Sequence, residues 1–382
     1  MKYKLFLVTF ITLFLNTSYA TNILFLSYDY GDANAFKELM PELSNRKINY
    51  EIIAIGKSRD RFKDNLIKNV NCLREFDNDY LIKDRSNLIS KNNIVCLKNS
   101  LKYKPDIIIS GMSSGSLAAI LNSFDNLKKV AYYDNFDPYP KNDPNYYTSS
   151  FINTLKNKSL DKLFIVAEKT KNSFKQKIDI STKDIIVVGN PSLIEWQKTN
   201  KKCPSKKSLI EYLNIDYKKN FIVFAGDTTE DYKESFYNFA EAIKNMPNYI
   251  AIVSYHPKTN GEFEKNIKNI LDIKNMVIAD TDSKNPSTIC LSTLSNIFIV
   301  HKSSMGSQAL SASKNVIFIA KNTYKNSAID YGLADLVYFP KDIIKSIKKN
   351  HNKDTDDNFY ITYGIPKDSI KSFINSILDT TK

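Results

Sequence analysis

The stretch IIISGMSSGS at residues 107–116 decides the fold of this 382-residue chain, because it joins an apolar strand to a helix through a turn of small residues. The second half repeats the pattern as IFIVHKSSMGS at residues 297–307. Each copy has an apolar run, a turn with two serines, a glycine and a helix start. The repetition predicts two similar units in which strands alternate with helices.

Further apolar runs of strand length surround both copies and are separated by helical patterns. They lie at residues 23–27, 50–55, 106–109, 130–133, 163–167 and 185–188 in the first half, and at 221–225, 250–254, 276–279, 297–300 and 316–320 in the second. Short, fully apolar strands that alternate with helices predict parallel sheets covered on both faces. The predicted fold class is therefore α/β, with two doubly wound, Rossmann-type domains facing a central cleft.

The chain divides into five predicted segments. Residues 1–20 combine early lysines, a short apolar core and small residues before Thr21, which is typical of a secretory signal peptide rather than of a membrane anchor. The others are an N-terminal domain at 21–198, a linker at 199–212, a C-terminal domain at 213–365 and a final helix at 366–382 that crosses back to the N-terminal domain. We expect a periplasmic or secreted protein with no transmembrane anchor after cleavage.

The composition is globular, with 42% hydrophobic and 25% charged residues and a net charge of +13. The excess lysines are dispersed, and no segment interleaves basic and aromatic residues, so a nucleic-acid partner is not expected. Only 10 residues are glycine, and seven of them closely follow predicted strands. That distribution predicts tight turns along the rim of a binding site.

Four cysteines at positions 72, 96, 203 and 290 permit three disulfide connectivities in an exported protein. We favour Cys72–Cys96 and Cys203–Cys290, because each pair stays within or beside one predicted domain; free buried thiols are the alternative. The spacing does not suit structural zinc. The acidic stretch from Asp227 to Asp231 is interpreted as a solvated turn rather than as a metal site.

Candidate ligand-binding residues follow predicted strands, where open α/β sheets bind ligands. The helix start at residues 303–307 offers backbone N–H groups and hydroxyls beside Lys302, which suits phosphate or carboxylate; an ordinary serine cap is the alternative. His256 is either a ligand contact or a structural histidine. The predicted ligand-binding residues are Gly31, Ser113, Ser114, His256, Pro257, His301, Lys302, Ser303, Ser304 and Gly306.

The His256-Pro257 pair, followed about 45 residues later by a strand and Ser303-Ser304, resembles the GT-B glycosyltransferase superfamily, especially bacterial sialyltransferases, capsule transferases and CDP-glycerol-type polymerases. Residues 187–194, VVGNPSLI, also resemble the interdomain segment of UDP-N-acetylglucosamine 2-epimerases. The resemblance implies that His256 lies near a donor nucleotide or phosphate and that Ser303, Ser304 and Gly306 hold the phosphates. No bound cofactor is expected, and the implied substrate is a nucleotide-linked donor such as a CMP- or UDP-sugar.

The same resemblance implies an acidic catalytic base on an N-domain loop. The candidates are Asp29, Asp32 and Asp134, with Asp137 beside the last; helix capping and turn formation are the alternative roles. Epimerases carry acidic residues around the serine-glycine loop, where this chain has Lys302 and Gln308, which argues against epimerase chemistry.

Two functions remain open from the sequence. The first is an exported, glycosyltransferase-like protein that binds a phosphate-containing or sugar ligand for work on envelope glycans. The second is a non-catalytic exported protein that binds a glycan or a partner in a hinged cleft. Substrate identity, metal use and oligomeric state do not follow from the sequence.

Overall fold

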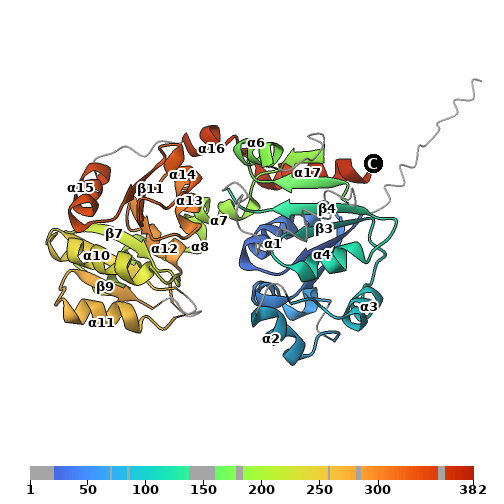
Figure 1. Cartoon of the computed structure of the whole chain (residues 1–382), viewed down its shortest axis with the longest axis horizontal. Helices are drawn as coiled ribbons and strands as arrows, with labels where there is room; N and C mark the ends of the chain where they lie inside the picture. Colours follow the sequence, from blue (N-terminus) through green and yellow to red (C-terminus); the bar gives the residue numbers. More distant parts are fainter. Residues whose placement is uncertain are drawn as a thin grey trace, which may run out of the picture.

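The computed structural model describes residues 21–68, 71–83, 87–136, 160–177, 184–256, 259–280, 285–351 and 358–382. Two lobes lie side by side, one for each half of the chain (Figure 1). The predicted signal peptide, Asp137 and Pro257 lie outside the described residues and stay predictions. None of the described helices is long and apolar enough to cross a bilayer.

The N-terminal lobe contains a six-stranded sheet in the order β2-β1-β3-β4-β5-β6, with every neighbouring pair parallel. The strands are β1 (Asn22–Ser27), β2 (Asn49–Ala54), β3 (Ile107–Gly111), β4 (Lys128–Tyr133), β5 (Lys162–Ile165) and β6 (Ile185–Val187). Their helices are α1 (Tyr30–Asn45), α2 (Glu75–Lys83), α3 (Lys91–Asn99), α4 (Gly115–Asn122) and α6 (Glu168–Lys177). The central strands β1, β3 and β5 are almost completely buried because helices cover both faces of the sheet, which explains why they read as unbroken apolar runs.

The C-terminal lobe repeats this architecture in the order β12-β11-β10-β7-β8-β9, again parallel throughout. The strands are β7 (Asn220–Ala225), β8 (Tyr249–Ser254), β9 (Met276–Ala279), β10 (Ile297–Val300), β11 (Asn315–Ile319) and β12 (Ala334–Val337). The helices are α10 (Tyr232–Lys244), α11 (Glu262–Ile270), α12 (Thr288–Ser292), α13 (Met305–Leu310), α14 (Ser327–Asp330) and α15 (Pro340–His351). The predicted α/β class with two doubly wound domains is confirmed.

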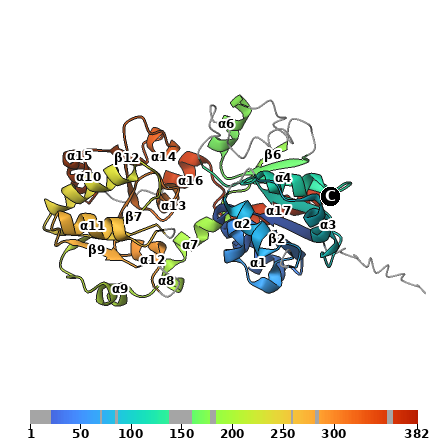
Figure 2. The ribbon, with the colours of Figure 1, turned by 60° about the horizontal axis from the view of Figure 1, so that its bottom comes forward.

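Two segments connect the lobes, as the turned view shows (Figure 2). The first runs through α7 (Ile194–Gln197), α8 (Thr199–Lys202) and α9 (Lys206–Leu213), so the predicted linker at 199–212 is largely helical. The second is α16 (Asn358–Tyr363), followed by α17 (Ser369–Thr381). In α17, Phe373 packs edge-on against Phe36, Tyr132 and Phe164 of the N-terminal lobe, with ring centroids 5.0 to 6.4 Å apart. The last helix is therefore part of the first lobe's core.

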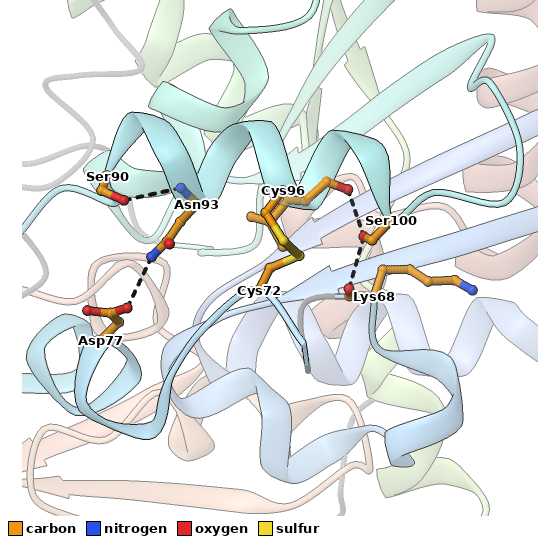
Figure 3. The surroundings of a disulfide bond; sticks show 8 residues. Lys68, Cys72, Asp77, Ser90, Asn93, Cys96 and Ser100 are labelled. Carbon is orange, nitrogen blue, oxygen red and sulfur yellow. Dashed lines mark hydrogen bonds between the residues drawn. A yellow bond between two sulfur atoms is a disulfide. The ribbon is translucent and has the colours of Figure 1, made fainter.

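Both favoured disulfides are present, which confirms the predicted connectivity over free thiols. Cys72–Cys96 ties the segment after β2 to α3, and Figure 3 shows the hydrogen bonds beside it. Asn93 donates to Asp77 at 3.3 Å, and the Ser100 hydroxyl donates to the Lys68 carbonyl at 3.0 Å. Cys203–Cys290 fixes the end of α8 to α12 in the C-terminal lobe.

Candidate functional site

A buried carboxyl group lies at the carboxyl end of β1. Asp32 is in the first turn of α1 and is only 2% exposed. Its Oδ1 accepts hydrogen bonds from the Ser27 hydroxyl at 2.6 Å and from the backbone N–H of Tyr28 at 3.3 Å. Its Oδ2 accepts from the Ser113 hydroxyl, also at 2.6 Å. Strands β1 and β3 are neighbours in the sheet, so Ser113 reaches the side chain of Asp32 although the two residues are 81 positions apart in the sequence.

Two glycines make room for carboxylates at this edge of the sheet. A Cβ on Gly111, the last residue of β3, would collide with Oδ2 of Asp32. A Cβ on Gly31 would likewise collide with Oδ2 of Asp134, the residue that follows β4. Asp134 is partly exposed, whereas Asp32 is buried. The structure therefore brings together two of the three predicted catalytic aspartates.

Burial raises the pKa of Asp32 to about 7, and the nearby charge of Asp134 acts in the same direction. The hydrogen bonds from Ser113 and Ser27 oppose this rise but do not cancel it. Asp32 therefore gains or loses its proton near neutral pH, which is the property that a general acid or base needs. We call Asp32 and Asp134 the carboxyl pair.

The other N-lobe candidates mainly cap helices. Asp29 is the N-cap of α1 and accepts from the Tyr30 N–H at 2.9 Å. Ser114 is the fully buried N-cap of α4 and accepts from the Ser116 N–H at 3.1 Å. These bonds satisfy amides that the first helical turn leaves unpaired.

In the C-terminal lobe, His301 directly follows β10 and is completely buried. Its Nδ1 lies 2.7 Å from the Ile319 carbonyl oxygen, and its Nε2 lies 3.1 Å from Oδ1 of Asp231. Both ring nitrogens face oxygen acceptors, so both hydrogen bonds form only when the ring carries two protons. His301 therefore holds the Asp231 carboxylate from the buried side.

Asp231 has two side-chain partners, because its Oδ1 lies 3.1 Å from the His301 ring and its Oδ2 accepts from the Lys302 ammonium group. Burial alone would raise the pKa of Asp231, but the hydrogen bonds and charges of Lys302 and His301 lower it to about 2. The backbone N–H of Lys302 donates to Asp227 at 3.3 Å. Asp227 also accepts from the N–H groups of Thr228 and Thr229, as the predicted turn requires, and residues 228–230 are exposed. The sequence did not predict the contacts with the loop after β10, which arise because strand order places β7 beside β10.

The predicted serine loop is partly occupied by internal bonds. The hydroxyl of Ser303 accepts from the Met305 N–H at 3.2 Å, and Ser304 precedes α13 without a side-chain cap bond. A Cβ on Gly306 would meet Phe318 and Val300, so this glycine lets α13 pack closely on the sheet. His256 is partly exposed after β8, and its carbonyl accepts two bonds from Thr259.

Sequence reasoning did not select Ser27 or Asp231 as site residues. It selected Ser113, but not as a partner of Asp32. Ser27 ends a strand and Asp231 lies in a polar stretch, so neither has a distinctive local pattern. The relevant signal was topological: polar residues follow strands that become neighbours in the sheet. Among the described residues, no group of three or more His, Cys, Asp or Glu side chains could hold a metal ion.

No protein-family model matches this sequence, and no curated protein matches it by sequence. Solved structures of similar fold include UDP-GlcNAc 2-epimerase from Neisseria meningitidis bound to UDP-GlcNAc, with a TM-score of 0.68, 17% identity, and coverage of 94% of this chain and 100% of that one. The wall teichoic acid polymerase TagF with CDPG aligns with a TM-score of 0.56 and 13% identity, over 94% of this chain and 88% of that one.

A glycosyltransferase from Rickettsia africae aligns with a TM-score of 0.57 and 15% identity, over 95% of this chain and 93% of that chain. Together, these similarities confirm the resemblance to the GT-B superfamily and the two-domain GT-B-like fold. At such low identity they establish the fold alone. The roles of individual residues must be argued from this chain.

Proposed function

We propose that this protein is an exported, glycosyltransferase-like GT-B protein that binds a phosphate-containing sugar donor and acts on envelope glycans. The carboxyl pair is the observation that carries this proposal. A buried carboxyl group with a pKa of about 7 beside a partly exposed carboxylate, at the carboxyl ends of β1 and β4, is suited to remove a proton from an acceptor hydroxyl.

In the proposed reaction, the acceptor oxygen attacks the anomeric carbon of the donor sugar and forms the new glycosidic bond. The bond from that carbon to the donor phosphate breaks, and the phosphate leaves with the electron pair. The hydroxyl proton passes to Asp134, which is the more exposed member of the pair. Asp32 lies beside it, and the pKa of Asp32 is raised to about 7 by burial and by the charge of Asp134.

The nature of the donor is supported by similar structures, because the epimerase from Neisseria meningitidis was determined with UDP-GlcNAc and TagF with CDPG. Lys302 brings a cationic side chain directly before Ser303 and Ser304, the predicted phosphate contacts. Transfer is favoured over epimerisation because the helix after the serine loop carries Gln308 rather than an acid. The Gln308 side-chain oxygen is already occupied, since it accepts a hydrogen bond from the Trp196 ring N–H at 3.3 Å.

Export is supported by the signal-like residues 1–20 and by the two disulfides. Disulfides persist in oxidising compartments and are rare where thiols are kept reduced. Fractionation of cells that produce the full chain tests this part of the proposal. Recovery of the uncleaved protein from the cytoplasm with all four thiols reactive would refute export.

A non-catalytic glycan-binding protein is the second candidate function. It is favoured by one observation: Asp231 already pairs with the Lys302 ammonium group, so a donor phosphate must compete with an internal carboxylate for this cation. A binding protein of this fold would retain the carboxyl pair as hydrogen-bond acceptors for sugar hydroxyls.

Thermal-shift and calorimetric titrations with UDP, UDP-GlcNAc, CMP, CDP and free N-acetylglucosamine distinguish the two functions. The transferase proposal predicts saturable nucleotide binding, together with donor turnover that Asp134→Asn lowers at least about 100-fold. Asp379→Asn, which removes an exposed carboxylate of α17, serves as the matched control and should leave turnover unchanged. Binding of the free sugar without any nucleotide would favour the second candidate and refute the first.

A further inference from the structure

A groove with a volume of about 470 Å³ lies where both connecting segments meet the C-terminal lobe, and we call it the hinge groove. Its walls come from the first connection, the second connection, and the ends of α12 and α13. The ten lining residues are Trp196, Gln197, Thr199, Ser292, Thr293, Ser311, Ala312, Ser313, Lys314 and Tyr360. Its volume falls within the range of small-molecule sites.

The two connecting segments are bonded to one another at this groove. The side-chain amide of Gln197 in α7 donates to the Tyr360 hydroxyl in α16. Trp196 packs edge-on against Phe298 of β10, with ring centroids 5.4 Å apart, and donates to Gln308. The hinge groove is therefore a built junction between three parts of the chain, separate from the carboxyl pair.

Hydroxyl oxygens dominate one wall of the hinge groove. Ser292, Thr293 and Ser311 donate their hydroxyl protons to carbonyls three residues earlier, at 2.6 to 2.7 Å. Because these protons are already used, the remaining lone pairs act as acceptors. A wall of acceptors suits a ligand that brings many O–H donors.

Lys314 calls for a second feature of the ligand, a negative charge. Its ammonium group donates to the Ser295 carbonyl at 2.8 Å. Burial lowers the pKa of Lys314 to about 8, and the nearby positive charge of Lys206 adds to this effect. None of the described lining residues carries a carboxylate. An anionic group on a ligand would compensate the two ammonium charges.

We propose that the hinge groove binds an acidic saccharide, whose hydroxyls bond to Thr293 and Ser311 and whose anionic group pairs with Lys314. The ring lies near the aromatic side chains of Trp196 and Tyr360, which offer apolar surface to its C–H groups. Because both connections line the groove, the occupant contacts the segments about which the lobes would rotate.

The experiment uses the intrinsic fluorescence of Trp196, since this is the only tryptophan in the sequence and it lines the hinge groove. The full-length protein is titrated with D-glucuronate, glucose and inorganic phosphate at pH 7. We expect a saturable fluorescence change with glucuronate, and affinities for glucose and phosphate at least about tenfold weaker, because each lacks one half of the recognised chemistry.

Variants locate the site. Lys314→Gln should weaken glucuronate binding at least about tenfold, whereas Lys348→Gln, at an exposed lysine of α15, should not change it. Tyr360→Phe keeps the aromatic ring, so it should keep the folded circular-dichroism spectrum and bind glucuronate within about twofold of the wild type. Asp134→Asn should leave glucuronate binding unchanged, so the result is independent of the proposed transferase site.

Three outcomes would overturn the proposal. The first is the lack of a saturable response to glucuronate in a protein that is shown to be folded. The second is equal affinity for glucuronate in the wild type and in Lys314→Gln. The third is loss of binding in Asp134→Asn, which would place the saccharide at the carboxyl pair instead.

Discussion

The substitution Asp32→Asn should remove the loss of stability that the N-terminal lobe undergoes as the pH rises towards 7. The protonated carboxyl group and the amide have nearly the same shape, and both present an acceptor oxygen and a donor group. The hydroxyls of Ser27 and Ser113 can rotate to serve either group, and the space left by Gly111 accommodates both. The substituted amide therefore mimics the neutral state of Asp32 but cannot ionise.

The magnitude follows from the pKa of Asp32, which folding raises from 3.8 to about 7. Below about pH 4 the wild-type carboxyl group is neutral in both the folded and unfolded states, and its stabilising contribution is complete. As the pH rises to 7, the unfolded state ionises while the folded state still holds its proton, so stability falls. The total loss is about 4 kcal/mol above pH 7, from about 1.36 kcal/mol for each pKa unit.

Urea unfolding from pH 5 to pH 8, followed by circular dichroism and Trp196 fluorescence, measures this effect. We expect Asp32→Asn to exceed the wild type in stability by about 1.5 kcal/mol at pH 5 and by about 4 kcal/mol at pH 8. Asp379→Asn should follow the wild-type curve throughout. A constant difference between Asp32→Asn and the wild type across this pH range would refute the assignment of a neutral buried acid.

Three further predictions concern other parts of the structure. Asp231→Asn should destabilise the C-terminal lobe by about 1–2 kcal/mol at pH 7, a difference in urea unfolding that shrinks as the pH falls from 4 towards 2, because the pKa of Asp231 is lowered to about 2. Gly189→Ala should cost more than about 2 kcal/mol in thermal unfolding, since φ is +83° and a Cβ would collide with Ser369; Gly332→Ala, at φ +70° with open space, isolates the collision. Removing Cys72–Cys96 by a double alanine substitution should cost about 3 kcal/mol in urea unfolding for its 24-residue separation, and reduction of the wild type should cost more, because it also opens Cys203–Cys290.

The sequence predicted the strands of both sheets well, because strands buried on both faces leave long apolar runs. The edge strand β12 was missed, since Ala334–Val337 is short, partly exposed on every residue and contains Asp335. The helices α2 and α3 were also missed. They have few buried residues, and the Cys72–Cys96 disulfide and the Asn93–Asp77 bond hold them in place, which local periodicity cannot reveal.

The candidate aspartates were identified from the sequence, but their roles could not be separated. Asp29 and Asp32 are three residues apart, and only the three-dimensional structure shows that one caps α1 while the other is buried against Ser113. The distinction depends on strand order, because β3 must lie beside β1 for Gly111 to admit the carboxyl group. The same holds for Asp231, whose partners come from the loop after β10.

One short segment, residues 189–197, joins the carboxyl pair to the hinge groove. At its start, the Gly189 carbonyl accepts from the buried Tyr132 hydroxyl at 3.2 Å, and the Asn190 side chain donates to the Asp134 carbonyl at 3.4 Å. At its end, Trp196 lines the hinge groove. A ligand that shifts α7 must therefore act on the backbone that holds Asp134, so glucuronate should alter donor affinity by the same factor by which donor alters glucuronate affinity. A donor affinity that saturating glucuronate leaves unchanged would show that the two sites are not linked in this way.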